Sequence, residues 1–131
     1  MSAFLTLLNV DQLEDTSHNG RGTWQLNAPL EYQSDLIGLI VVPAGFVTDF
    51  ATVPRIPVVF DLVGDRGNLA TTIHDYLYTT GNDAIHQRVR DRALADAVLR
   101  EALRTQGVPH PLAYIMWAGV RVFGESYWNS R

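Results

Sequence analysis

The chain has 131 residues, of which 47% are hydrophobic, so it has the length of one domain and enough apolar material to bury a core without disulfide bonds. It contains no cysteine, which excludes disulfides, thiolate catalysis and cysteine-ligated zinc, and leaves histidine and carboxylates as the candidate metal ligands. The formal net charge of -4 and the lack of a dense Lys/Arg tract argue against nucleic-acid binding, which needs clustered cations.

The first half of the chain has the pattern of a small antiparallel β-sheet. Short runs rich in β-branched and aromatic residues alternate with turn residues, and the predicted strands are residues 4–10, 23–26, 31–33, 37–42 and 46–48. Gly45, in the predicted connection 43–45, is the natural residue for a positive φ angle between two strands.

From about residue 65 onward the apolar residues recur with a helical period. The predicted helices are residues 68–80, about 89–105 and 111–123. The third is apolar nearly all round, which indicates that it lies in the core or against a partner. With no repeat, low-complexity tract or linker in sight, we predict one α+β domain, residues 1–131, in which a small antiparallel N-terminal sheet packs against about three C-terminal helices.

The sequence pattern favours neither export nor insertion into a membrane. No secretory signal peptide is evident, because the first residues lack a cationic start and the apolar run ends at Asp11. The most apolar stretch, residues 111–124, contains Arg121 and is shorter than the roughly 20 residues that a membrane-spanning helix requires. We therefore expect a soluble protein that stays in the cytoplasm where it is synthesised.

Three short motifs place ionisable residues in apolar surroundings, where such groups persist only when they are paired, hydrogen-bonded or metal-bound. The motifs are residues 45–54, residues 73–78, and Arg92 with residues 95–96, and their acidic and imidazole members are Asp49, His74, Asp75 and Asp96. Consecutive helical positions differ by about 100°, which places His74 at the edge of the apolar face around Ile73 and Asp75 almost opposite it. Asp96 lies at the border of the apolar face of the next helix.

The functional interpretation is that Asp49, His74 and Asp96 meet where the helices cross the sheet. One nitrogen and two oxygen ligands would suit zinc, iron or manganese, with Asp75 or Glu101 as the catalytic base. Without a metal, the same group could act as a histidine–carboxylate acid–base pair.

In the alternative, structural interpretation, these residues only stabilise the fold. Thr48 or Asp49 would cap a turn, His74 would donate to a backbone carbonyl, and Asp96 would pair with Arg92 or Arg100. The remaining candidates carry weaker signals: His86 falls in a predicted loop, and Trp117 is at least as well suited to the core as to a ligand.

These motifs, in this order, resemble the phage and prophage family catalogued as domain of unknown function 1353. The resemblance spans about residues 24–128, and carried over by position it assigns the motif residues Asp49, His74, Asp75, Arg92 and Asp96, beside the structural positions Gly45, Thr48, Thr52 and Pro54. Thr52 stands where the family pattern usually has serine. A β-branched residue is a poor substitute for a serine nucleophile, so Thr52 indicates a turn or hydrogen-bonding role and disfavours a Ser-His-Asp hydrolase.

Members of that family are mostly uncharacterised and occur among virion, tail and lysis genes. The resemblance therefore implies a phage-encoded protein of the virion or host cytoplasm, acting at the tail tip or in penetration of the cell envelope. Its partners would be other tail or virion proteins, or further copies of itself. Two alternatives stay open: a metal-dependent hydrolase of peptidoglycan peptides, and a purely structural adaptor.

Overall fold

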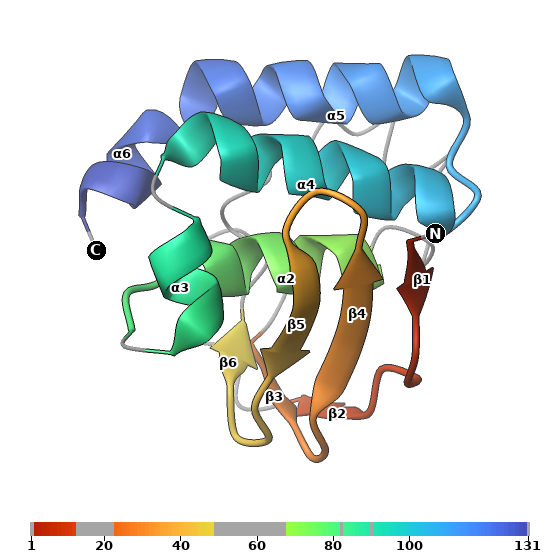
Figure 1. Cartoon of the computed structure of the whole chain (residues 1–131), viewed down its shortest axis with the longest axis vertical. Coiled ribbons are helices and arrows are strands. Elements are labelled where there is room, and N and C mark those ends of the chain that lie inside the picture. The colour runs from red at the N-terminus through yellow and green to blue at the C-terminus, as the bar shows by residue number, and fades with distance from the viewer. Residues whose placement is uncertain (1, 13–22, 49–67, 82, 90, 131) are drawn as a thin grey trace.

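The computed structural model describes residues 2–12, 23–48, 68–81, 83–89 and 91–130, and it has the α+β architecture that the sequence predicts (Figure 1). Within these residues the strands form two three-stranded antiparallel sheets. The first sheet has the order β1-β4-β5, formed by Ala3–Phe4, Leu30–Ser34 and Gly38–Val42. The second has the order β2-β3-β6, formed by Val10–Gln12, Trp24–Leu26 and Val47–Thr48.

The predicted strand at residues 4–10 is the main difference from the expected β half. Phe4 ends β1 and Val10 begins β2, and these two strands belong to different sheets. Leu5 donates its backbone N–H to Glu31, whereas the carbonyl of Asn9 accepts from Asn27. The segment therefore crosses from one sheet to the other instead of forming one long strand.

The three long helices fall where the apolar periodicity places them. They are α2 (Asn68–Leu77), α4 (Arg92–Thr105) and α5 (His110–Phe123). Two five-residue helices, α3 (Ala84–Arg88) and α6 (Glu125–Asn129), were not predicted. Figure 1 shows α5 running alongside α4, with α2 on the other side of α4 next to the strands. In the described part of the chain, no helix is long and apolar enough to cross a membrane.

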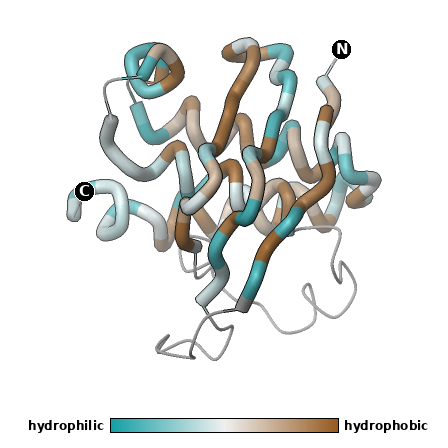
Figure 2. Tube along the Cα trace, turned by 90° about the horizontal axis from the view of Figure 1, so that it is seen from below, coloured by the Kyte–Doolittle hydropathy of each residue, from teal (hydrophilic) through white to brown (hydrophobic). Residues whose placement is uncertain are grey.

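The core lies between the first sheet and helices α2 and α4. Side chains alternate along β4 and β5, so that Tyr32 and Ile40 face each other across the pair and are buried, whereas Leu39 and Val41 are exposed. In β4 the less buried positions are polar, whereas β5 is apolar on both faces; Figure 2 shows apolar and polar stretches along the chain by their hydropathy. Helix α2 is buried at every position from Ala70 to Leu77, so its polar residues sit inside the fold.

Gly45 joins β5 to β6 with a φ angle of 89°, in the left-handed region where a Cβ atom is strained. The positive φ angle that the sequence predicts is confirmed, although the two strands it joins lie in different sheets. Its N–H donates to the carbonyl of Leu26 at 2.8 Å, which ties the turn to β3. A Cβ atom at Gly45 would meet no other atom within 4 Å, so the cost of a side chain there is conformational and not steric.

Substitution of Gly45 should therefore separate backbone strain from packing. We expect Gly45→Ala to lower the free energy of unfolding by about 1 kcal/mol, because alanine resists the left-handed conformation. Gly45→Asn should cost less, because asparagine tolerates that region. Urea denaturation of the two variants measures the difference, and equal losses for both would contradict this account of the turn.

Candidate functional site

Helix α2 and the residue that follows it supply two aromatic side chains to a buried polar cluster. His74 and Tyr78 are four residues apart and therefore lie on the same side of α2, where their ring centroids are 4.2 Å apart. Tyr78 follows the last residue of α2, and its N–H continues the helical pattern by donating to the carbonyl of His74 at 3.1 Å. Both residues face α4, and His74 is fully buried.

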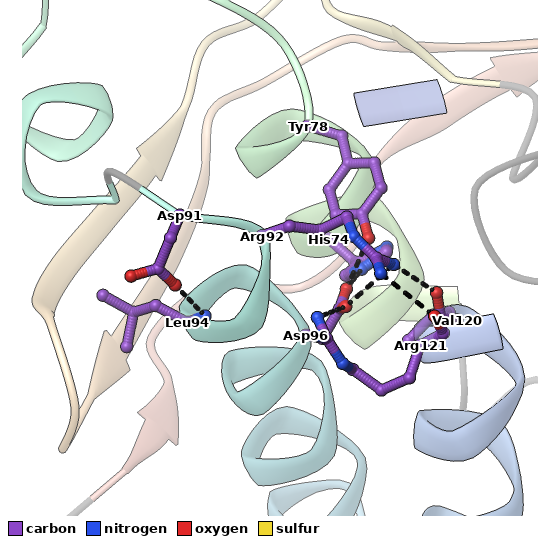
Figure 3. A network of polar contacts seen from close by, with 8 residues as sticks. All are labelled: His74, Tyr78, Asp91, Arg92, Leu94, Asp96, Val120 and Arg121. Carbon is purple, nitrogen blue, oxygen red and sulfur yellow. Dashed lines mark hydrogen bonds and ion pairs between the residues drawn. The ribbon is translucent and has the colours of Figure 1, made fainter. Parts of the chain in front are cut away.

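Asp96 of α4 is the centre of the cluster and is also fully buried (Figure 3). Its Oδ1 atom lies 2.7 Å from Nε2 of His74 and accepts a hydrogen bond from the Tyr78 hydroxyl at 2.5 Å. Its Oδ2 atom accepts from Nη1 of Arg121 at 2.8 Å and lies 3.5 Å from Nη1 of Arg92. The two oxygens of the Asp96 carboxylate therefore bind side chains from three parts of the chain: α2 with the residue after it, α4 and α5.

Arg92 also binds the end of α5. It donates from Nη1 to the carbonyl of Val120 at 2.8 Å and from Nη2 to the carbonyl of Arg121 at 3.0 Å. The Val120 carbonyl also accepts from the N–H of Gly124 at 2.8 Å. The Arg121 carbonyl lies in the last turn, where carbonyl groups lack partners within the helix, and a cation there also complements the helix dipole. Arg92 thus stabilises Asp96 and caps α5 at the same time.

Gly124 allows this close approach. A Cβ atom at Gly124 would lie 2.5 Å from the carbonyl oxygen of Val120 and 2.8 Å from the Tyr78 hydroxyl. Both distances are too short for a real contact, and the carbonyl belongs to the backbone that Arg92 holds. Any side chain at Gly124 would therefore push the end of α5 away from the cluster.

The pKa of Asp96 reflects a balance between burial and its donors. Burial raises the pKa of the carboxyl group, but the hydrogen bonds from His74 and Tyr78, with the bond from Arg121, outweigh burial and bring the pKa below its ordinary value. The pKa of Tyr78 moves in the opposite direction: burial raises it, and the hydrogen bond to the Asp96 carboxylate raises it further. Asp96 is therefore an anion and Tyr78 a neutral donor at neutral pH.

Asp75 lies beside His74 in the sequence but has a different partner. Its side chain is buried, and its Oδ2 atom accepts a hydrogen bond from the hydroxyl of Thr48 at the end of β6. Adjacent positions on α2 thus reach in two directions, Asp75 towards the second sheet and His74 towards α4. The structure brings His74 and Asp96 together, whereas the hydrogen bond of Asp75 is to Thr48.

The other predicted residues have separate places. Asp49, Thr52 and Pro54 lie outside the described residues, so the expected meeting of Asp49 with His74 and Asp96 stays a prediction. Glu101 accepts a hydrogen bond from the Tyr32 hydroxyl at 2.6 Å and is held there against β4. Arg100 does not pair with Asp96; its guanidinium lies over Tyr114 and Trp117, away from that carboxylate.

Asp96 is poorly suited to bind a metal directly in this arrangement. Two donors already use Oδ1, and the arginines at Oδ2 would repel a divalent cation. In the ranges that the structure describes, no group of three or more His, Asp and Glu side chains is placed to hold an ion. His74 fits a metal better, as a ligand whose other ring nitrogen is held by Asp96, because metal-binding histidines commonly donate to a carboxylate in this way.

Sequence reasoning did not select Tyr78 and Arg121 as members of the cluster. Tyr78 ends the motif of residues 73–78, whereas Arg121 is 25 residues from Asp96 in the chain and only the tertiary fold brings them together. His86 also differs from its predicted loop position: it lies in α3, with Nδ1 hydrogen-bonded to Asp83 and Nε2 3.0 Å from the carbonyl of Tyr76.

The fold and the cluster define a small α+β protein whose helices are joined through one buried carboxylate. Comparison with protein families matches residues 24–120 to the family described as protein of unknown function (DUF1353), and the chain belongs to this family. No curated protein and no solved structure matches the chain. The matched range contains His74, Arg92 and Asp96, and Arg121 follows its last residue directly.

Removing the charge of Asp96 should destabilise the protein strongly. Asp96→Asn keeps the shape of the side chain but leaves two arginines without their buried anion, so we expect the free energy of unfolding to fall by about 3 kcal/mol or more. Urea denaturation at pH 7 measures the loss. Glu125→Gln, which removes an exposed carboxylate, is the control and should change stability by less than about 0.5 kcal/mol.

The pH dependence tests the same contact independently. Because the pKa of Asp96 is lower in the folded than in the unfolded chain, its carboxylate stabilises the folded state above the unfolded-state pKa of about 3.9. That stabilisation is lost as the pH falls through the lower, folded-state pKa. The difference in stability between the wild type and Asp96→Asn should therefore be complete above about pH 5 and shrink below about pH 4. A difference that persisted unchanged to about pH 2 would contradict it.

Proposed function

We propose that this chain is a bacteriophage-encoded virion protein, associated with the tail or with penetration of the host envelope, that acts by binding other virion proteins or further copies of itself. The resemblance of its motifs to a phage and prophage family supports the phage origin. The structural observation that carries the binding role is the apolar outer face of α5.

The outer face of α5 exposes large apolar side chains where a surface helix would normally be polar. Ile115 and Val122, seven residues apart, lie on one side of α5 and are 40% and 69% exposed, whereas Met116 and Val120 face α4 and are buried. No charged side chain occurs between residues 111 and 120. Exposed apolar surface of this kind, with the neighbouring exposed Tyr114 and Phe123, is characteristic of protein-binding sites.

The buried cluster supports a binding role over catalysis. His74 and Asp96 are fully buried, and the Asp96 carboxylate is held by four side chains that join α2, α4 and α5. Such a group stabilises the fold without contacting a substrate. In a protein that acts by binding, these residues keep α5 in place, so that its outer face is presented as one rigid surface.

Particle association is the direct test. We expect the chain to be present in purified phage particles in a fixed ratio to the tail proteins, as measured by quantitative mass spectrometry. Val122→Asp should fold normally but be incorporated at least tenfold less, because a charge in an apolar interface must be desolvated. Leu7→Asp, which places the same charge at an exposed apolar residue outside α5, is the matched control. Recovery of the wild-type chain only from the particle-free lysate would overturn the proposal.

A metal-dependent hydrolase of peptidoglycan peptides is the second candidate, favoured by the contact between His74 and Asp96. In that enzyme His74 would bind zinc, iron or manganese, Asp49 would be a further ligand, Asp96 would orient the imidazole, and Asp75 would be the base. The ion would supply a bound water with a pKa of about 7 for attack on the peptide bond.

Metal content and hydrolysis together distinguish this enzyme from a structural adaptor. If the chain is the hydrolase, it should bind about one equivalent of metal, His74→Ala should lose the metal, and Asp96→Asn should bind it roughly 10–100-fold more weakly. Asp75→Asn should keep the metal and lose hydrolysis of purified peptidoglycan. A chain that takes up no metal and cleaves no peptidoglycan, and in which His74→Ala lowers only thermal stability, would be a structural adaptor instead.

A further inference from the structure

A cationic groove runs between α4 and α5, with a volume of about 410 Å³. Its lining residues are Ala97, Arg100, Glu101 and Arg104 on α4 and His110 and Trp117 on α5. It is lined by none of the residues that bind Asp96. The chain as a whole is acidic, so a groove with two arginines and a histidine is a local reversal of its charge.

Arg100 is held in place by two aromatic rings. Its guanidinium carbon lies 5.5 Å from the ring centroid of Tyr114 and 5.6 Å from that of Trp117, within the range of a cation–π interaction. The two rings are 5.7 Å apart and pack on each other. A guanidinium group that packs its flat face against an aromatic ring keeps the N–H groups at its edge. These N–H groups can donate two parallel hydrogen bonds to one carboxylate.

Arg104 is also oriented by the protein, and the groove contains little negative charge to neutralise it. Nη1 of Arg104 donates to the carbonyl of Val108 at 2.7 Å. Among the described residues, neither Arg100 nor Arg104 forms an ion pair with a carboxylate. Glu101, the acidic residue of the groove, accepts from the Tyr32 hydroxyl. The groove thus offers two positioned guanidinium groups to an anion from outside.

We propose that this groove binds an acidic segment of a partner protein. Carboxylates of that segment bind Arg100 and Arg104, and its apolar side chains pack against Trp117 and the exposed part of Tyr114. Arginine and aromatic residues are the types that dominate the binding energy of protein interfaces. Binding of such a segment does not depend on membership of a virion, so this proposal and the proposed function can fail separately.

The same observations disfavour a nucleic acid as the occupant. Nucleic acid binding requires many phosphate contacts and exposed ring faces on which bases stack. This chain has a net charge of -4, and Arg100 already lies over the rings of Tyr114 and Trp117, which also contact each other. A short acidic peptide needs only a few charge-assisted hydrogen bonds and one apolar contact.

Fluorescence anisotropy with a labelled twelve-residue peptide of alternating glutamate and leucine tests the proposal on the full chain. We expect saturable binding that weakens as salt is raised, and at least tenfold weaker binding of the same peptide with glutamine in place of glutamate. The double variant Arg100→Gln, Arg104→Gln should lose at least tenfold in affinity. Arg100→Lys should recover only part of it, because lysine lacks the stacked fork.

The matched control is Arg88→Gln, which removes one positive charge from α3, where Arg88 donates to the carbonyl of Ile37. It should bind the glutamate peptide as the wild type does, and circular dichroism should show that all variants are folded. Three results would overturn the proposal: no saturation by the glutamate peptide up to millimolar concentration, equal binding by the double variant, or tighter binding of a single-stranded oligonucleotide of the same length.

Discussion

The described part of this fold depends on one buried anion. Asp96 has no exposed surface, and a carboxylate in such a place is tolerated only when its charge and its lone pairs are satisfied. The donors come from α2 and the turn after it, from α4 itself and from α5. Apolar packing is non-directional, whereas each of these contacts has a defined direction and length. The cluster therefore fixes how the three long helices lie against one another, and Arg92 extends this control to the carbonyl groups at the end of α5.

Helix α2 joins the two halves of the molecule because it is buried on all sides. His74 connects it to α4, and the next residue, Asp75, connects it to Thr48 at the end of β6. Two ionisable residues that are adjacent in sequence thus serve two different layers of the fold. The groups best suited to chemistry are also the groups that hold the layers together, so loss of activity in a variant has meaning only when its stability is measured as well.

Local pattern predicted the helical half of the fold well and the pairing of strands less well. The long helices followed from apolar periodicity. The same geometry placed Asp96 at the border of the apolar face, whereas in the structure it is fully buried. Helices α3 and α6 are five residues long, too short for a period to be visible. The division of the strands into two sheets depends on partners distant in sequence, such as Trp24 opposite Thr48. Arg121 was missed for the same reason, because no local signal relates it to Asp96.

Three parts of helix α5 have different roles, which explains why the helix is apolar nearly all round. One side packs on α4, and the last turn is held by Arg92. The outer side is exposed and apolar, and it adjoins the cationic groove at Tyr114, which is 52% exposed and contacts Trp117 of the groove. A stable protein interface buries roughly 1,200–2,000 Å², more than a groove of this size can supply. A partner whose acidic segment occupied the groove would therefore gain most of its contact area from the adjoining apolar face. Charge would determine where that partner docks, and apolar area would determine how tightly it stays.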